Sequence, residues 1–252
     1  MIDDVFTAME EAVTQAPTQG ADTRLDESWL LGFDTETTGT KPGKDAIVSA
    51  SLVLRDPEQG YEGDSVASWV INPHRHISKG ASRVNGFTDE YLAENGSEPA
   101  ESIAQIAGII AGAQAKMIPL LAYNAPFDVH MLNGDIGRWA GGTVPEFVPD
   151  DMLVVDPLVL DRAISHRSGR RTLSYTAEYY GVRPHGNYHD ATADTVVSID
   201  LIKPMTTLYP QLARITLDHL MDWQRQAHEE WKASFNQWLT SHMRRPITDS
   251  WF

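Results

Sequence analysis

Apolar and polar positions follow two different patterns along this chain. Three short apolar runs, each closed by turn residues, come first, and we expect strands at 29–35, 46–54 and 66–71. Further along, apolar residues recur every three or four positions and are separated by two more short apolar runs. This pattern predicts helices at 100–115, 126–139, 157–164, 172–180 and 191–202, and strands at 118–122 and 152–155. The order predicts an α/β fold, in which helices flank a mixed β-sheet with an antiparallel meander at one side.

The two ends of the chain differ from this middle part. Apolar residues four apart predict a short helix at 3–15, and the polar stretch that follows is typical of a linker. The tail at 211–243 carries an apolar stripe at spacings of three to five, formed by Leu212, Ile215, Leu220, Trp223, Ala227, Trp231, Phe235 and Trp238. Tryptophans on one helix face bury much area, so we expect this stripe to dock on its own domain, with a dimer or partner surface as the alternative. The predicted units are a helix and linker at 1–28, a domain at 29–205, and a long C-terminal helical extension at 206–252.

Composition narrows the class of protein. The chain has 252 residues, 42% of them hydrophobic, which is enough for one large domain with a core. It has no cysteine, which excludes disulfides and thiolate zinc sites. No apolar run approaches the length of a membrane span, and the acidic N-terminus lacks the pattern of a signal peptide, so we expect a soluble, cytoplasmic protein.

The net charge of −15 bears on the partners. Such a surface repels nucleic acid at long range and disfavours a broad electrostatic footprint. If the protein acts on nucleic acid, it should grip a short stretch through cations and a few local contacts, or receive it from a partner.

Two carboxylates follow the first apolar run. Asp34 and Glu36 lie two residues apart, so in a strand they point to the same face with their Cα atoms about 7 Å apart. Two anions held beside apolar surface repel each other, and a shared divalent cation of the Mg²⁺ or Mn²⁺ kind removes the difficulty. An aspartate at a strand end can equally be an ordinary turn residue.

Three more residues could join this pair. Asp128 begins a predicted helix directly after a predicted strand, at the sheet edge where α/β folds collect ligands. His189 and Asp194 lie five residues apart at the start of another predicted helix. Taken singly, each has an ordinary explanation: a first-turn acid favoured by the helix dipole, or a histidine with no role in chemistry.

The motifs taken together carry a resemblance. They are Phe33-Asp34-Thr35-Glu36-Thr37-Thr38-Gly39, Asn124-x-x-Phe127-Asp128, and His189-x-Ala191-x-x-Asp194, with weaker matches at 84–90 and 156–162. In this order they resemble the DEDDh-type 3′–5′ exonucleases of the ribonuclease-H-like superfamily, which include the proofreading epsilon subunit of bacterial DNA polymerase III. The resemblance covers about residues 29–205, and the tryptophan-rich tail is similar to that of single-domain actinobacterial members. The chain departs from many relatives at Tyr123 and at Asn85, where they have histidine.

The resemblance implies a ribonuclease-H-like fold and a two-metal hydrolase. Asp34, Glu36, Asp128 and Asp194 would hold two divalent cations, Mg²⁺ or Mn²⁺, and His189 would take the proton from the attacking water. The products would be nucleoside 5′-monophosphates released from the 3′ ends of single-stranded DNA. The expected substrate-binding residues are Thr37, Thr38, Gly39, Tyr123, Asn124 and Phe127, although core packing is the preferred alternative for Phe127.

Several alternatives stay open. The substrate could be RNA ends or short oligoribonucleotides, and a non-catalytic, polymerase-associated binding protein is a third reading. The basic cluster at 166–171 could hold phosphates of the strand or could be a solvated loop. A DNA polymerase or a second copy could bind the C-terminal helix, and we expect no membrane partner.

Overall fold

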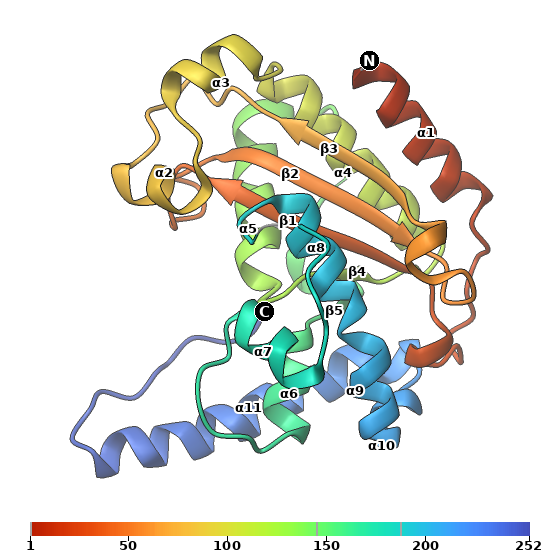
Figure 1. The fold of residues 1–252 in the computed structure, drawn as a ribbon, viewed down its shortest axis with the longest axis vertical. Coiled ribbons are helices and arrows are strands. Elements are labelled where there is room, and N and C mark those ends of the chain that lie inside the picture. Colours follow the sequence, from red (N-terminus) through yellow and green to blue (C-terminus); the bar gives the residue numbers. More distant parts are fainter. Residues whose placement is uncertain (1, 145, 187) are drawn as a thin grey trace.

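A twisted mixed sheet forms the centre of the computed structural model, which describes residues 2–144, 146–186 and 188–252 (Figure 1). Its strands follow the order β3-β2-β1-β4-β5, with β1 paired antiparallel to β2 and parallel to β4. The strands are β1 Leu30–Thr37, β2 Ile47–Arg55, β3 Ser65–Val70, β4 Leu120–Leu121 and β5 Val154–Val155. The predicted α/β class and the antiparallel meander at one side are therefore confirmed. The last two strands are shorter than the apolar runs that contain them.

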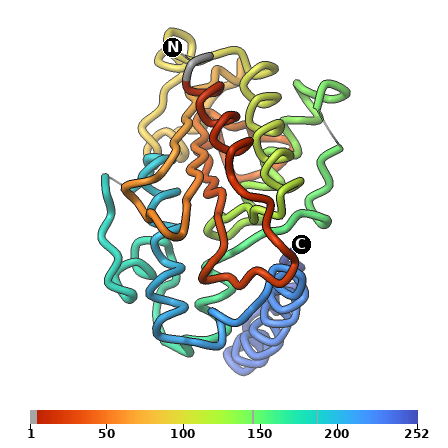
Figure 2. Tube along the Cα trace, turned by 90° about the vertical axis from the view of Figure 1, so that its right-hand side faces the viewer, coloured from red at the N-terminus to blue at the C-terminus, as the bar shows by residue number. Residues whose placement is uncertain are grey.

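Helices cover both faces of this sheet. α1 Ile2–Gln15, α4 Pro99–Ala115 and α5 Pro126–Asp135 pack on one face, and α8 Ala191–Asp200 packs on the other (Figure 2). The remaining helices are α2 Lys79–Asn85, α3 Asp89–Asn95, α6 Pro157–Ile164, α7 Leu173–Tyr180, α9 Ile202–Leu208, α10 Pro210–Ala213 and α11 Leu217–Ser241. Short 3₁₀ turns lie at Leu25–Glu27, Gly60–Gly63 and Pro149–Asp151, and a π-helical turn at Ile136–Ala140 extends α5. Two apolar clusters, one on each side of the sheet, make up most of the core. None of the described helices has the length and hydropathy needed to cross a membrane.

The N-terminal helix is part of the domain. Met9 and Val13 are buried against β3 and α4, whereas Val5 on the preceding turn is 41% exposed. The linker that follows is tied down by Gln19, whose Nε2 donates to the Met117 carbonyl at 2.8 Å and whose Oε1 accepts from Trp29 N at 2.7 Å. The expected helix at 3–15 is confirmed, and the expected linker is an ordered connection.

Some elements differ from the prediction. The helices α2 and α3 occupy a stretch for which the apolar pattern indicated no element, because each is only seven residues long and α2 buries no side chain fully. Pro204 lies inside α9, beyond the predicted end of the helix at 191–202. It is the third residue of that helix, where a backbone N–H has no intrahelical acceptor to lose.

The C-terminal extension docks with its first half. Leu220, Gln224 and Ala227 of α11 are buried against α6 and β5. Gln224 also completes the open edge of β5, since its Nε2 donates to the Val154 carbonyl at 2.7 Å and its Oε1 accepts from Asp156 N at 2.8 Å. The second half of α11 projects beyond the domain (Figure 1), and the chain then folds back so that Trp251 is buried.

Candidate active site

The strand β1 presents its carboxylates to one face of the sheet. Alternate residues of a strand point to opposite faces, so Gly32, Asp34 and Glu36 share a face. Helix α8 covers that face at short range because Gly32 has no side chain. An added Cβ would lie only 2.5 Å from Ile199 Cδ1 of α8. This close approach brings Asp194, in the first turn of α8, over the end of β1.

A capped turn fixes the start of α8. Asp190, the N-cap, accepts a hydrogen bond from Ala193 N at 3.0 Å. His189 before it has a left-handed backbone, with φ of 69°, and its N–H donates to Asp194 Oδ2 at 3.0 Å. This turn folds the exposed His189 back toward the helix, so histidine and aspartate lie together as the sequence predicts.

Asp128 reaches the site from the opposite face. It lies in the first turn of α5 and is only 3% exposed. Its Oδ1 accepts two hydrogen bonds from Thr35 of β1, one from the backbone N–H at 3.0 Å and one from Oγ1 at 2.7 Å. Thr35, between the two acids of β1, therefore holds the third acid beside them.

Hydrogen bonds to Asp156 support the turn that leads into α5. Asn124 has a left-handed backbone, with φ of 65°. Its N–H donates to Asp156 Oδ1 at 2.9 Å, and the N–H of Ala125 donates to Asp156 Oδ2 at 3.1 Å. The indole of Trp251 donates to the same Oδ2 at 3.0 Å. The end of the described chain thus helps to orient the segment that carries Asp128.

The four acids oppose one another's ionisation. Burial raises the pKa of Asp34 well above its usual range, and the carboxylates of Asp128, Asp194 and Glu36 raise it further. Burial, with Asp194 as the next cause, raises the pKa of Glu36 to about 7. Burial also raises the pKa of Asp128 to about 7, against the two hydrogen bonds from Thr35, and it raises the pKa of Asp194. Without a counter-charge, this cluster is costly to hold ionised at neutral pH.

A divalent cation fits this arrangement. Carboxylate oxygens of Glu36 and Asp194 and a ring nitrogen of His189 lie within 4.8 Å of one another. The buried Oδ1 of Asp194 has no hydrogen-bond partner among the described residues. Asp34 and Asp128 lie outside this group of three but interact with it through their charges. Hard cations such as Mg²⁺ prefer carboxylate oxygens as ligands. A buried carboxylate oxygen without a hydrogen-bond donor, in a cluster of acids, suits such a cation.

Comparison with known proteins assigns the chain that carries this site to a family. A family model described as Exonuclease (RNase_T) matches residues 31–202. The chain belongs to the exonuclease family. The matched region runs from β1 through α8, so it contains all four acids and His189. The resemblance to 3′–5′ exonucleases of the ribonuclease-H-like superfamily is thereby confirmed at the level of the family.

Individual relatives agree with this membership. The chain is 30% identical over 178 residues to the DNA polymerase III subunit epsilon of Treponema pallidum, across 70% of this chain and 75% of that one. It is 25% identical over 192 residues to a PolC-type DNA polymerase III of Staphylococcus epidermidis, but it spans only 12% of that polymerase. The solved structure of E. coli exonuclease I with a dT13 oligonucleotide shares the fold, with a TM-score of 0.58 and 22% identity over 73% of this chain and 42% of that one.

The other residues expected at an exonuclease site lie around the end of β1 and the start of α5. Thr37 Oγ1 donates to the Gly39 carbonyl at 2.6 Å, and Thr38 N donates to the Ala46 carbonyl at 2.8 Å, so these three residues form the turn after β1. Asn124 is exposed beside Asp128, whereas Phe127 is half-buried against the core. Their contacts with substrate stay predictions.

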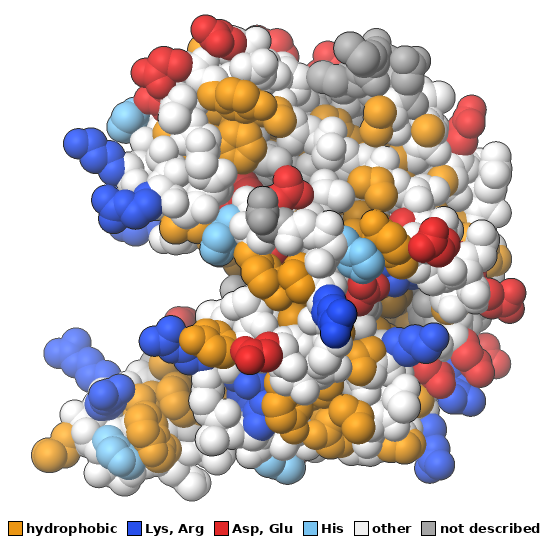
Figure 3. All heavy atoms as spheres, viewed as in Figure 1, with side chains coloured by type: hydrophobic (Ala, Val, Ile, Leu, Met, Phe, Trp, Pro, Cys, Tyr) orange, Lys and Arg blue, Asp and Glu red, His pale blue; other side chains and the backbone are white. Residues whose placement is uncertain are grey.

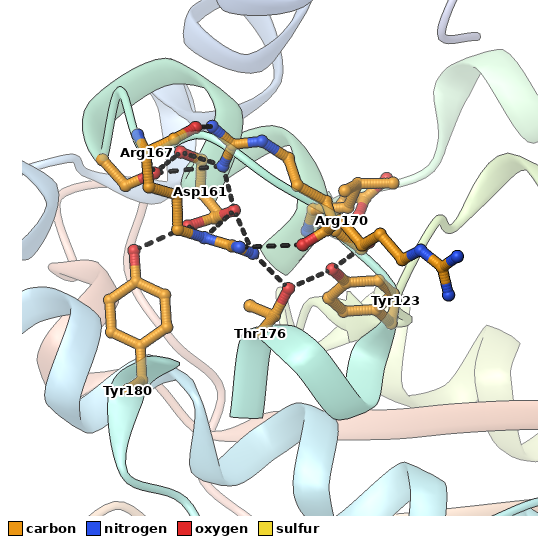
Figure 4. Close-up of polar contacts among 10 residues, drawn as sticks. Tyr123, Asp161, Arg167, Arg170, Thr176 and Tyr180 are labelled. Atoms are coloured by element: carbon orange, nitrogen blue, oxygen red, sulfur yellow. Dashed lines mark hydrogen bonds and ion pairs between the residues drawn. The ribbon is translucent and has the colours of Figure 1, made fainter. Parts of the chain in front are cut away.

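Tyr123 takes a structural role that the sequence did not indicate. Its hydroxyl donates to the Arg171 carbonyl at 2.7 Å and lies 2.7 Å from Thr176 Oγ1 (Figure 4). Burial raises the pKa of Tyr123 far above its usual range. The hydroxyl is thus engaged inside the protein, and any substrate contact would use the ring.

Two arginines of the basic cluster at 166–171 are engaged inside the protein, and phosphate binding by the rest of the cluster stays a prediction. Arg167 and Arg171 both pair with the fully buried Asp161 of α6, which also accepts a hydrogen bond from Tyr180 at 2.9 Å (Figure 4). Two guanidinium groups therefore neutralise one buried carboxylate and hold the loop. Arg170 stays exposed, with its guanidinium 5.7 Å from the centre of the Tyr175 ring.

The supporting roles of three residues escaped the sequence analysis. Thr35 and Asp156 act through hydrogen bonds to residues far away in the chain, which no local pattern reveals. Asn85 was noted as a departure from relatives. Its Nδ2 donates to the Thr37 carbonyl at 3.2 Å, and its hydrogen bond to Glu36 lowers the pKa of that carboxyl against the effect of burial.

Proposed function

We propose that this protein is a metal-dependent 3′–5′ exonuclease that hydrolyses phosphodiester bonds at the 3′ ends of single-stranded DNA and releases nucleoside 5′-monophosphates. One observation carries the proposal. Asp34, Glu36, Asp128 and Asp194 come from three elements far apart in the chain and converge at one place, next to His189. A fold has little reason to gather four carboxylates, each with a raised pKa, unless cations compensate them.

The acids are the proposed ligands of two divalent cations, Mg²⁺ or Mn²⁺. Such ions, when bound, would supply Lewis-acid activation of water and charge stabilisation at the phosphate. Asp194 Oδ1 suits a ligand position because it has no donor in the described structure, and Glu36 lies in the same group of ligand atoms. Asp128 is held for this role by Thr35, which occupies Oδ1 and leaves Oδ2 for an ion.

His189 is the proposed general base. Its ring lies at the exposed edge of the site, and a ring nitrogen belongs to the group formed with Glu36 and Asp194. A neutral imidazole at this position can accept the proton of the attacking water. The hydrogen bond from its backbone to Asp194 keeps the residue at this edge.

The substrate class rests on the relatives. The chain is similar to a DNA polymerase III subunit epsilon, and solved structures of exonuclease I with the same fold hold a dT13 oligonucleotide or ssDNA. These likenesses support single-stranded DNA as substrate and a DNA polymerase as a candidate partner. The acidic surface agrees with local recruitment of phosphate by cations rather than by a broad basic surface.

End-labelled oligonucleotides test the proposal. Purified protein with Mn²⁺ should shorten a 5′-labelled DNA 20-mer stepwise from the 3′ end and release nucleoside 5′-monophosphates, and a matched RNA 20-mer should react more slowly. EDTA and Asp34→Ala should each abolish the shortening. Cleavage that starts at the 5′ end, or shortening that persists in EDTA, would reject the proposal.

A further inference from the structure

The projecting half of α11 carries a row of stacked rings. Trp231 and Phe235 lie with centroids 5.3 Å apart at 14°, Phe235 and Trp238 lie 5.7 Å apart at 8°, and His242 follows at 4.3 Å. The row continues the face with which the first half of α11 docks, but here Trp238 is 46% exposed. A guanidinium, that of Arg244, lies 5.7 Å from the centre of the Trp238 ring.

A basic cleft opens at the inner end of this row. It has a volume of about 490 Å³ between α6 and α11, and Arg162, His166, Trp223 and Trp231 are among its lining residues. The Arg162 guanidinium lies 3.7 Å from the centre of the Trp231 ring. Its buried Nε has no hydrogen-bond partner, and its guanidinium forms no ion pair with any described residue. Asp156 and Asp161 act on Arg162 through their charges alone, so its guanidinium has no carboxylate in hydrogen-bond contact among the described residues.

Helix α6 links the cleft to the candidate active site. Asp156, the N-cap of α6, supports the turn before Asp128, and Arg162 lies six residues further along the same helix. Six helical residues span about 9 Å. Figure 3 shows hydrophobic side chains next to Lys and Arg side chains on the projecting lobe, below a notch in the surface.

We propose that the cleft and the row of rings bind the single-stranded part of the nucleic acid whose 3′ end enters the active site. Arg162 would contact a backbone phosphate, and bases would stack on Phe235 and Trp238. Flat rings interleaved with guanidinium groups are the combination that binds single strands without regard to sequence. A single strand offers a phosphate at every nucleotide for Arg162 to contact, whereas a second copy of this chain offers no such series of anions. The proposal rests on the proposed function, since it concerns the same substrate.

Binding measured without catalysis tests this inference. In EDTA, fluorescence anisotropy should give a dissociation constant for labelled dT20 that rises about tenfold in Arg162→Gln and in Trp238→Ala. Trp238→Phe should bind nearly as wild type because it keeps a stacking ring. Arg214→Gln, which removes an exposed arginine at the end of α10, should bind unchanged. The slope of log affinity against log salt should fall by about 0.7 in Arg162→Gln.

Chain length separates the cleft from the active site. With Mn²⁺, both substitutions should lower kcat/KM for dT20 and leave kcat/KM for dT4 unchanged, and thermal unfolding should show that both variants fold. Unchanged dT20 affinity in the folded variants would overturn the inference and favour a protein partner for this face. Equal losses on dT4 and dT20 would also overturn it. Wild-type protein that binds dT20 in this way but hydrolyses no oligonucleotide would reject the proposed function alone.

Discussion

Asp128 shows how a single side chain suited to catalysis can lower the stability of the folded protein. It is buried, its neighbours are acids, and its pKa is raised to about 7. Its surroundings therefore destabilise the ionised carboxylate relative to the protonated form. Hydrogen bonds from Thr35 fix its position without neutralising its charge. Residues of this kind are expected where function, and not folding, selects the side chain.

Replacing this acid by its amide should therefore separate stability from activity. We expect Asp128→Asn to abolish nuclease activity but to raise the melting temperature of the metal-free protein at pH 8, because a buried charge is removed. Asp161→Asn is the matched control: Asp161 is equally buried but is paired with Arg167 and Arg171, so its loss should lower the melting temperature. A fall in melting temperature for Asp128→Asn would contradict the claim that the ionised Asp128 destabilises the metal-free protein. Differential scanning calorimetry with EDTA makes the comparison.

His189 should matter for rate more than for metal. We expect His189→Gln to lower kcat by about 10²–10⁴-fold, the usual contribution of a general base. Affinity for Mn²⁺, measured by calorimetric titration, should change little because the four carboxylates remain. Loss of Mn²⁺ binding in this variant would make the imidazole a ligand and would contradict its role as base.

At the scale of elements, the contact between α8 and β1 controls the site. Gly32 is the point of closest approach, and it allows Asp194 to lie over the acids of the strand. The sequence predicted both elements and both sets of acids. It did not predict the distance between them, because the role of a single glycine depends on a helix more than 150 residues away.

A methyl group at this contact should move the helix. We expect Gly32→Ala to destabilise the protein by about 1–3 kcal/mol, because the new Cβ meets Ile199 and Thr195 at under 3.0 Å. Activity should fall as well, since Asp194 shifts with α8. Gly108→Ala in α4 is the control: nothing lies within 4 Å of its added Cβ, so it should be neutral or stabilising. Urea unfolding gives the stability, and an unaffected Gly32→Ala variant would show that α8 does not depend on this glycine.

Other elements show where sequence patterns reach their limit. The amphipathic helices with long apolar faces, such as α4, were predicted to within a residue or two, because burial of one face imposes a period on the sequence. The helices α2 and α3 were not predicted, since seven-residue helices that bury little impose no such period. In the tail, the sequence showed the apolar stripe. It could not show that only the first half of the stripe docks, because this depends on where α6 and β5 end.

For the whole molecule, protons and divalent cations should compete at one place. The folded-state pKa values of Glu36 and Asp128 are raised to about 7 from ordinary values near 4. Folding of the metal-free protein therefore favours the protonated forms. Their contribution to stability is complete below about pH 4 and is lost as pH rises through 7.

Added metal should reverse that loss at high pH only. At pH 8, Mn²⁺ at about a hundred times its dissociation constant should raise the melting temperature by roughly 5–10 °C, and at pH 5 the increase should be small because protons occupy the carboxylates. The Glu36→Gln, Asp128→Asn double variant should show no Mn²⁺ effect at either pH. An equal shift at both pH values in the wild-type protein would place the bound ion elsewhere.

The most direct test of the central claim is to locate the ions. Crystals soaked in Mn²⁺ should show anomalous difference density among the carboxylates of Asp34, Glu36, Asp128 and Asp194, and Asp194→Asn crystals treated in the same way should lose at least part of it. Anomalous density confined to other parts of the molecule, or none at all in well-diffracting soaked crystals, would contradict the claim that these acids converge to bind metal.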